Sequence, residues 1–253
     1  MIKYLCPDDG MNEQLIRLWQ EAFGDSREFA ELYMGSAYSP SHCRCATEDG
    51  ELLAVLHVMD CTVHGKLYAY VYAAATAENA RGRGIFRGLI ADTEEYLKKN
   101  GYLGMVLSAG DDGLTAMYEK LGFSRISGLA PVEAKADGGK ITGLKRLNAE
   151  EYVRERKNHL PEGAVLPSEA MTAFLDKYAH LYVGDGFAFA AVTEGDSFTA
   201  AEFLGDEMKL SDVLRTLDYA EGTFYVPRES SRAMHRAFDD SLPPSLLGIA
   251  FNV

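Results

Sequence analysis

The sequence is short of cysteine and of positive charge, and each shortage excludes a class of protein. Four cysteines among 253 residues are too few for the disulfide framework of a small secreted protein. Cys43 and Cys45 lie two positions apart, so they share one face of a strand, but no second pair of ligands accompanies them at zinc-like spacing. We therefore interpret them as buried strand thiols and expect no metal site.

The charge balance is acidic. Lysine and arginine number 25 against 38 acidic residues, which gives a net charge of -13. Binding to phosphates needs clustered basic side chains, so nucleic acid and anionic membrane surfaces are disfavoured as partners. An acidic protein does suit a cationic partner such as an amine, although this indication is weak because many soluble proteins are acidic.

Long apolar runs are missing as well. None reaches the roughly 18 residues of a membrane span, and the first ten residues, MIKYLCPDDG, have no apolar signal-peptide core. We therefore expect a cytoplasmic location. The length suits one large domain or two small ones, with ample apolar residues for a core.

The apolar residues that are present alternate between helical and strand spacing. A helix is predicted up to Gly24 and a second helix up to Gly35. Strands are predicted at 43–48 and 51–59, on either side of the turn signal Asp49-Gly50. The next strand, 67–76, is apolar at nearly every position, which is typical of a strand covered on both faces in the middle of a sheet.

A glycine-rich loop joins this central strand to a helix. The loop is followed by helical spacing from Ile85 to Leu97 and then by a second buried strand at 102–109. Strand, loop, helix and strand in this order predict a right-handed crossover between parallel strands, with the loop at the carboxyl end of the first strand. A further helix is predicted before Gly122.

The second half of the chain repeats this order. Residues 127–143 are rich in glycine and small side chains, and we interpret them as a boundary that could contain a crossing strand. Patterns beyond it predict helix, two strands, helix and strand, followed by a helix at 231–238 and a final strand at 245–253. The second copy has no glycine-rich loop, so we infer a weak internal duplication with one competent half.

The loop itself, ENARGRGIF (78–86), has the composition of an anion site. Gly82 and Gly84 allow positive φ and bring bare N–H groups close to a ligand. The helix that begins at Ile85 adds N–H donors, and Arg81, Arg83 and Arg87 add charge. The pattern G-x-G-x-x-G is incomplete and the Walker pattern is absent, so spacing alone leaves a pyrophosphate cradle and a plain turn equally open.

Two stretches resemble the signatures of the GCN5-related N-acetyltransferases (GNAT). ATAENARGRGIFRGLI (75–90) is similar to their acetyl-CoA loop, R/Q-x-x-G-x-G/A, with matches at Arg81 and Gly84 and a departure at Phe86. AMYEKLGF (116–123) resembles their second signature, a helix with a tyrosine followed by Leu-Gly-Phe. The likeness covers about residues 1–127, and the layout is closest to tandem, Eis-like members.

The resemblance implies an α/β fold, in which helices flank a central mixed β-sheet. It also implies three segments: a GNAT domain at 1–127 that binds acetyl-CoA, a linker at 128–143, and a smaller, degenerate GNAT-like domain at 144–253. The expected activity is transfer of an acetyl group from acetyl-CoA to a primary amine of a small molecule or peptide, by direct attack. The alternative is a catalytically inactive acyl-CoA-binding regulatory or scaffold protein.

The same resemblance assigns roles to residues. The strand end would pair with the pantetheine amide and polarise the thioester carbonyl, and the loop would hold the pyrophosphate. These residues are Ala74, Ala75, Thr76, Arg81, Gly82, Arg83, Gly84, Ile85 and Phe86. Tyr118 would protonate the leaving thiolate, although its apolar stripe with Leu114, Met117 and Leu121 would by itself indicate a core tyrosine.

The group that removes the amine proton is left open. The strand before the loop has no acidic residue. Asp60, His64 and Glu28 are candidates, and no spacing singles out one of them. The carboxylate of Val253 is a further candidate by analogy with Eis-like proteins, and relay through water is equally plausible.

Overall fold

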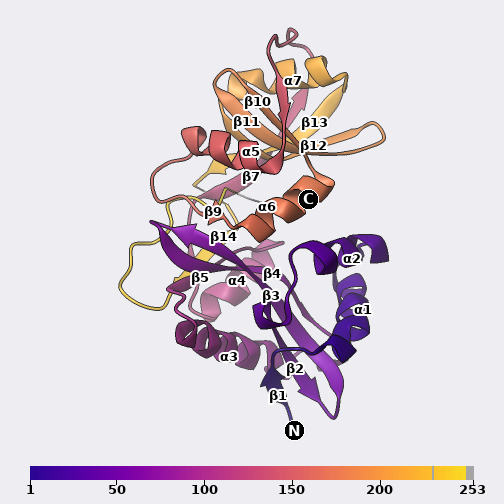
Figure 1. Ribbon diagram of the computed structural model, residues 1–253, viewed down its shortest axis with the longest axis vertical. Coiled ribbons are helices and arrows are strands. Elements are labelled where there is room, and N and C mark those ends of the chain that lie inside the picture. The colour runs from indigo at the N-terminus through magenta and orange to yellow at the C-terminus, as the bar shows by residue number, and fades with distance from the viewer. Residues whose placement is uncertain (230, 249–253) are drawn as a thin grey trace. The chain divides into compact units, whose positions relative to one another are not determined.

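The computed structural model describes residues 1–229 and 231–248 (Figure 1). Contacts divide the chain into two compact units. The first contains Met1–Leu107 together with Arg236–Ser241, and the second contains Ser108–His235 and the residues from Leu242 onward. The expected α/β fold with mixed sheets is confirmed, because each unit has helices and a sheet with both parallel and antiparallel neighbours. The units divide after Leu107, so helix α4 (Asp112–Lys120) is grouped with the second unit.

Five strands of the first unit pair in the order β1-β2-β3-β4-β5; β4 and β5 are parallel neighbours, and the other pairs among these five are antiparallel. Three helices accompany it, α1, α2 and α3, with short 3-10 turns η1, η2 and η3 in the connections. The strands are Lys3–Leu5, Cys43–Glu48, Glu51–Val63, Lys66–Thr76 and Gly104–Ser108. The helices are Asn12–Phe23, Arg27–Ser36 and Ile85–Lys99, and the turns are Asp9–Met11, Pro40–His42 and Glu78–Ala80. The predicted crossover from the central strand through the loop and helix to a parallel strand is thus confirmed.

Helices cover both faces of this sheet. Cys43 and Cys45 are fully buried and pack with Leu15 and Leu18 of α1. Arg44 lies between them in sequence and points to the other face, where it donates to Asp92 of α3 at 3.0 Å. The two cysteines are therefore strand thiols in the core, as the sequence predicts, and α1 and α3 lie on opposite faces (Figure 1).

Strand β4 contains a bulge just before the loop. Val55 of β3 pairs with Ala75, but His57 pairs with Tyr72, so β4 has one extra residue between these pairs. Ala73 lies there with a φ of +45°, in the left-handed region that a residue with a Cβ rarely adopts. The parallel pairs of β4 with β5, at Ala69 and Tyr70, both precede the bulge.

The second unit repeats this connectivity. Its six-stranded sheet runs β7-β13-β12-β11-β10-β8, and β12 and β13 are parallel neighbours joined through α7. The pairing of β11 with β12 also contains a bulge, between Ala190 and Ala191. These strands are Gly128–Lys135, Glu221–Arg228, Ser197–Gly205, Phe187–Glu194, His180–Gly184 and Lys145–Leu147. The remaining elements are β6 Ser124–Arg125, α5 Ala149–Arg156, η4 Lys157–His159, β9 Leu166–Pro167, α6 Glu169–Tyr178, η5 Glu207–Lys209, α7 Leu210–Leu217 and β14 Ala233–Ala237.

Three sequence expectations for the second half need correction or restriction. The segment 128–143 is not only a linker, because its first part is β7, whose Val132 and Ala134 pack into the core while its whole length pairs with β13. The helix expected at 231–238 is strand β14, which pairs with β6. Of the final strand expected at 245–253, Leu246 forms one isolated bridge with Ser127, and residues 249–253 lie outside the described residues.

Candidate active site

The glycine-rich loop connects the bulged end of β4 to the beginning of α3. Gly82 and Gly84 have φ values of +74° and +76°, which glycine adopts without strain. A Cβ added at either position would meet no atom within 4 Å, so the backbone conformation alone requires glycine here. The predicted use of both glycines for positive φ is confirmed.

The loop presents the N-terminus of α3 without a side-chain cap. Gly84 is the N-cap residue, and the first N–H bonded back to the loop is that of Gly88, which donates to the Gly84 carbonyl at 3.1 Å. N–H groups of the first turn have no acceptor within a helix, and the helix dipole makes that end positive. Residues 81–84 are exposed, so an anion can reach this end of α3.

The loop arginines have different partners. Arg81 Nε donates to the Thr76 carbonyl at 3.2 Å, which ties the loop back to the end of β4. Arg83 pairs with Glu48 at 2.6 Å, and this hydrogen bond is the main cause that lowers the pKa of the Glu48 carboxyl. Both arginine side chains are exposed and are available to a phosphate, although Arg83 would have to exchange Glu48 for it.

The strand residues expected to contact pantetheine lie beyond the bulge. Ala75 and Thr76 pair with Val55 and Ala54 on the β3 side of β4. The opposite edge of β4 faces β5, and its parallel pairs stop at Tyr70. An amide can pair with this edge as an added strand would. Of the remaining predicted residues, Ile85 is buried and Phe86 is partly buried in the first turn of α3.

Tyr118 lies on α4, which begins after Asp111, whose carboxylate accepts from the Leu114 N–H at 2.7 Å. Its ring packs edge-on against Phe123 of the Leu-Gly-Phe segment, with centroids 5.3 Å apart. The side chain is 6% exposed, and burial raises the pKa of its hydroxyl. A phenol with a raised pKa stays protonated at neutral pH, as a proton donor must. Tyr118 belongs to the second unit, and its part in the chemistry stays a prediction.

The candidate bases do not gather at the loop. Asp60 pairs with Ala69 across the sheet, seven residues before Thr76, which at about 3.3 Å per residue places it about 20 Å from the loop. His64 lies still farther along, in the turn between β3 and β4. Glu28 is exposed in the first turn of α2. Val253 lies outside the described residues.

The carboxylates of Asp60 and Glu28 also accept hydrogen bonds from other groups. Hydrogen bonds lower the pKa of Asp60, chiefly the bond from His42, with a further one from Tyr102. Hydrogen bonds to its own backbone and to Ser26 lower the pKa of Glu28. A lowered pKa makes a carboxylate a weaker base, so neither residue has the properties expected of the base.

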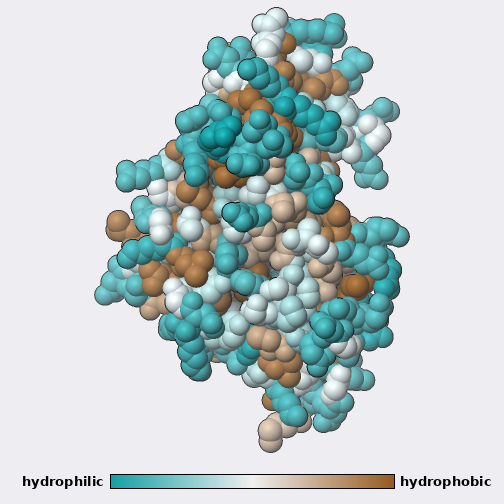
Figure 2. Space-filling model, in the orientation of Figure 1, coloured by the Kyte–Doolittle hydropathy of each residue, from teal (hydrophilic) through white to brown (hydrophobic). Residues whose placement is uncertain are grey.

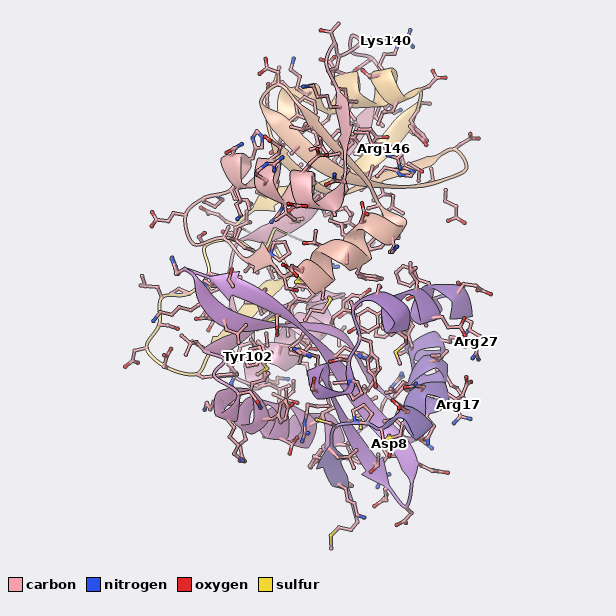
Figure 3. All side chains as sticks on the ribbon, viewed as in Figure 1. Asp8, Arg17, Arg27, Tyr102, Lys140 and Arg146 are labelled. Atoms are coloured by element: carbon pink, nitrogen blue, oxygen red, sulfur yellow. The ribbon has the colours of Figure 1, made fainter. Side chains whose placement is uncertain are left out.

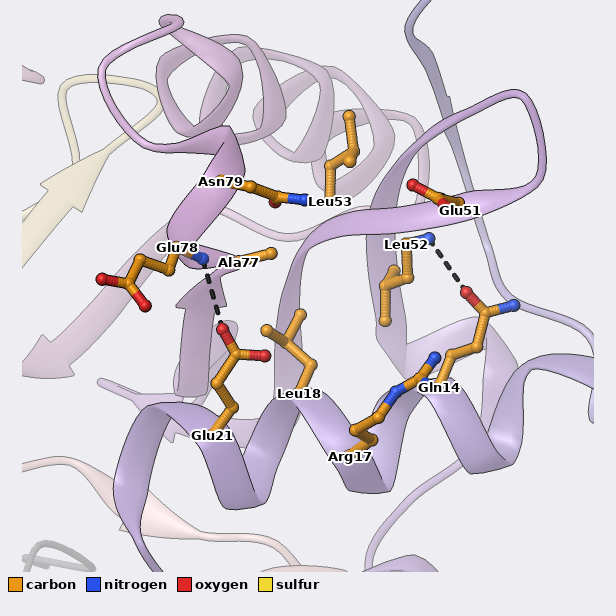
Figure 4. A pocket seen from close by; sticks show the side chains of 10 residues that line it. All are labelled: Gln14, Arg17, Leu18, Glu21, Glu51, Leu52, Leu53, Ala77, Glu78 and Asn79. Carbon is orange, nitrogen blue, oxygen red and sulfur yellow. Dashed lines mark hydrogen bonds between the residues drawn. The ribbon is translucent and has the colours of Figure 1, made fainter.

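A pocket of about 590 Å³ adjoins the loop and was not predicted from the sequence (Figure 4). It lies between α1, the start of β3 and the residues just after β4. Its lining consists of Gln14, Arg17, Leu18, Glu21, Glu51, Leu52, Leu53, Ala77, Glu78 and Asn79. Two hydrogen bonds connect α1 to the other walls of the pocket. Glu78 N–H donates to Glu21 at 3.3 Å, and Leu52 N–H donates to Gln14 at 2.9 Å.

The lining of the pocket combines apolar side chains with an excess of negative charge. Three carboxylates, Glu21, Glu51 and Glu78, face a single arginine, Arg17, which Figure 3 shows on the outer side of α1. Hydrophilic side chains dominate over α1 and α2 on the face seen in Figure 2. In sequence Arg17 and Glu21 match the solvated face of an amphipathic helix, and Glu51 and Glu78 are ordinary solvated carboxylates, which is why no pattern distinguished them.

Residues 8–126 match the acetyltransferase (GNAT) domain family. They form a GNAT acetyltransferase domain. The matched range contains both signature segments and the whole loop. No curated protein matches the sequence.

Solved structures share the fold of the acetyltransferase domain and of the second unit. A GCN5-related N-acetyltransferase from Anabaena variabilis superposes with a TM-score of 0.73 at 15% identity, over 94% of this chain and 73% of that one. Eis1 from Mycobacterium abscessus superposes with a TM-score of 0.62 at 13% identity, over 94% of this chain and 73% of that one. A GCN5-related N-acetyltransferase from Sphaerobacter thermophilus superposes with a TM-score of 0.59 at 13% identity, over 97% of this chain and 98% of that one. At these identities the likeness shows the fold alone.

Two further observations bear on the expected partners. Among the described residues, no group of three His, Cys, Asp or Glu side chains is placed to hold a metal ion. No helix in the described ranges combines the length and apolar character needed to cross a bilayer.

Proposed function

We propose that the chain is an acetyl-CoA-dependent N-acetyltransferase that acts on a primary amine. One observation carries the proposal: an exposed loop with two glycines at positive φ lies between a bulged strand end and an uncapped helix N-terminus. Backbone N–H groups in this arrangement bind a pyrophosphate, and Arg81 and Arg83 add positive charge in an otherwise acidic protein.

Acetyl-CoA supplies a thioester, whose acetyl group passes to the attacking amine while the thiolate leaves. The chain's own residues would bind and orient this group. The edge of β4 beyond Ala73 holds the amide of the pantetheine arm, and the N–H near Ala75 donates to the thioester carbonyl as negative charge develops on its oxygen. Tyr118, kept protonated by burial, holds the proton that the leaving thiolate needs.

The acceptor is expected to be cationic before it reacts. The net charge of -13 raises the local concentration of cations around the protein. The pocket beside the loop adds three carboxylates against one arginine. An amine must lose a proton before it attacks, and relay through water serves this step in the proposal, because Asp60 and Glu28 are engaged elsewhere.

The engagement of these two carboxylates also favours a second candidate, a protein that binds acyl-CoA without turnover. A single assay distinguishes the enzyme from the binding protein. Acetyl-CoA is incubated with the protein and a panel of amines, including polyamines, aminoglycosides and lysine peptides, and free thiol is recorded. Acetyl-CoA consumption with any amine supports the enzyme. Tight binding of CoA without turnover on the whole panel supports the binding protein.

Tyr118→Phe tests the assigned acid within the same assay. The ring and its packing on Phe123 are kept, and only the hydroxyl is lost. We expect turnover to fall about 10² to 10⁴-fold, the usual contribution of general acid catalysis, with little change in acetyl-CoA affinity. Wild-type turnover in this variant would remove Tyr118 from the reaction.

A further inference from the structure

A second group of chemically active side chains lies away from the loop, in the first unit. Ser39, Ser41 and His42 come from the segment around the turn η2, between α2 and β2. His42 is hydrogen-bonded to Asp60 of β3. Asp60 in turn accepts from Tyr102, which precedes β5 and is labelled in Figure 3. Asp60 is about 20 Å from the loop along β4, so this group is separate from the acetyl-CoA site.

The side chains form a continuous chain of hydrogen bonds. Ser39 Oγ is 2.8 Å from His42 Nδ1, and His42 Nε2 is 3.2 Å from Asp60 Oδ1. An ionised carboxylate only accepts, so Nε2 carries the hydrogen and Nδ1 is left to accept from the serine hydroxyl. The Tyr102 hydroxyl donates to the same carboxylate oxygen and fixes its position.

The Ser39 hydroxyl does not cap the turn η2, although a serine at an N-cap position usually does. Ser39 is the N-cap residue of η2, yet its side chain accepts no hydrogen bond from the turn. It is directed to the imidazole instead. The Ser41 hydroxyl lies 3.0 Å from Ser39 Oγ and 3.2 Å from His42 Nδ1, so a second donor is within reach of a group bound at Ser39.

The group is open to solvent, and the Asp60 carboxylate favours the imidazolium that forms when His42 accepts a proton. The side chains of His42 and Asp60 are 34% and 40% exposed. The bond between them raises the pKa of the His42 imidazole and lowers that of the Asp60 carboxyl. Buried structural networks exclude small molecules, whereas this one does not.

We propose that Ser39, His42 and Asp60 form a second reactive site that hydrolyses short-chain carboxylic esters. Ser39 Oγ bonds to the ester carbonyl carbon while its proton passes to His42 Nδ1. The bond from that carbon to the alcohol oxygen then breaks, and the alcohol leaves with the proton. Water attacks the acylated Ser39 by the same route, which releases the carboxylic acid and restores the serine.

Ser39 and His42 are the catalytic residues of this site, and Asp60 and Tyr102 are positioning residues. Asp60 fixes the imidazole tautomer and stabilises its protonated form, as the acid of a serine triad does. We place the Ser41 hydroxyl as the donor to the carbonyl oxygen, and a single side-chain donor at that position predicts slow turnover. The open setting favours a small acyl group and a good leaving alcohol.

The test uses the full chain without acetyl-CoA, so that its outcome is independent of the proposed acetyltransferase activity. Hydrolysis of p-nitrophenyl acetate is followed, and a fluorophosphonate is reacted with the protein and located by peptide mass spectrometry. Ser39→Ala and His42→Gln are expected to lower both rates at least about tenfold. Asp60→Asn lowers the labelling rate and Asp60→Glu restores part of it, with unchanged circular dichroism.

Matched controls separate this from adventitious hydrolysis. His64→Gln removes an exposed histidine, and Ser197→Ala removes an exposed serine of the second unit. Both are expected to react like the wild type. Phosphonate on Ser39 supports the proposal. Absence of label from Ser39, or equal hydrolysis by Ser39→Ala and the wild type, would overturn it.

Discussion

Arg81 donates a hydrogen bond from Nε to the carbonyl oxygen of Thr76, at 3.2 Å. The first fixed residue of the acetyl-CoA signature thereby fastens the loop to the end of the strand that precedes it. Its guanidinium keeps further donors for a phosphate. One side chain therefore shapes the cradle and contributes charge to it.

Arg81→Ala is accordingly expected to weaken CoA binding. A charge-assisted contact at an exposed site contributes about 1 kcal/mol, so the dissociation constant should rise roughly fivefold. Isothermal titration calorimetry measures this change. Arg146→Ala, in the second unit, removes the same charge away from the loop and should bind CoA like the wild type; an equal loss in both variants would mean that net charge alone is responsible.

Gly84→Asp is expected to abolish CoA binding. An aspartate there places a negative charge where the pyrophosphate would lie, in addition to the cost of positive φ. Gly24→Asp is the matched control, because Gly24 has a φ of +73° and also has no atom within 4 Å of an added Cβ. Both variants should lose stability in urea because of the positive φ, while only Gly84→Asp loses CoA.

The bulge at Ala73 is expected to store backbone strain. A left-handed conformation costs a residue with a Cβ roughly 1–2 kcal/mol, so Ala73→Gly should raise the free energy of unfolding by about 1 kcal/mol. Ala74→Gly, one position on and without positive φ, should lower it. Urea unfolding compares them; a loss of stability in Ala73→Gly would show that the strain is negligible.

His57 is expected to make the first unit sensitive to acid. The ring is 1% exposed among Trp19, Tyr33 and Tyr38, and burial lowers the pKa of its imidazole to about 3. The unfolded chain therefore binds a proton near pH 6.5 that the folded protein does not bind until about pH 3. Stability from this group is intact above pH 6.5 and declines between pH 6.5 and 3, by up to about 1.4 kcal/mol per pH unit.

Chemical unfolding at a series of pH values tests this slope. His57→Asn keeps a polar side chain that does not titrate, so its stability should fall less steeply than that of the wild type below pH 6.5. His64→Gln, which removes an exposed histidine, should keep the wild-type slope. Parallel curves for His57→Asn and the wild type would contradict the assignment.

Arg156 and Glu202 are expected to stabilise the second unit only as a pair. Arg156 Nε donates to the Glu202 carboxylate at 3.0 Å, and both side chains are almost completely buried. Removing one partner leaves an uncompensated charge, so Arg156→Leu should cost about 3–5 kcal/mol. The double variant Arg156→Leu with Glu202→Leu should recover most of this loss in thermal or urea unfolding. A double variant as unstable as the single one would argue against the pairing.

Much of the first unit could be predicted from the sequence. The apolar strand expected at 67–76 is β4 at Lys66–Thr76, and the glycines that identified the loop are the residues that adopt positive φ. Such local requirements leave a direct trace in residue types. The bulge left none, because it falls within Ala73–Ala74, where nothing distinguishes the strained alanine from its neighbours.

Features set by tertiary contacts could not be predicted either, because they too leave no trace in local residue types. Residues 231–238 contain good helix formers, yet β14 forms there because pairing with β6 outweighs a weak intrinsic preference. The pocket beside the loop draws Glu21 from α1, Glu51 from β3 and Glu78 from η3. In sequence each is an ordinary solvated carboxylate, and only the fold brings them together.

The second unit explains why a single CoA site per chain is expected. It has the same crossover and a comparable bulge, but the segment before its helix α7, Gly205 to Lys209, has a single glycine and no arginine, and it contains Asp206 and Glu207. Two carboxylates at this position would repel a pyrophosphate.

Calorimetric titration of CoA into the intact chain tests this account most directly. We predict binding of one CoA per chain for the wild type and for Gly24→Asp, and no binding for Gly84→Asp. Failure of the wild type to bind CoA, or equal affinity in Gly84→Asp, would contradict the assignment of residues 81–86 as the pyrophosphate cradle.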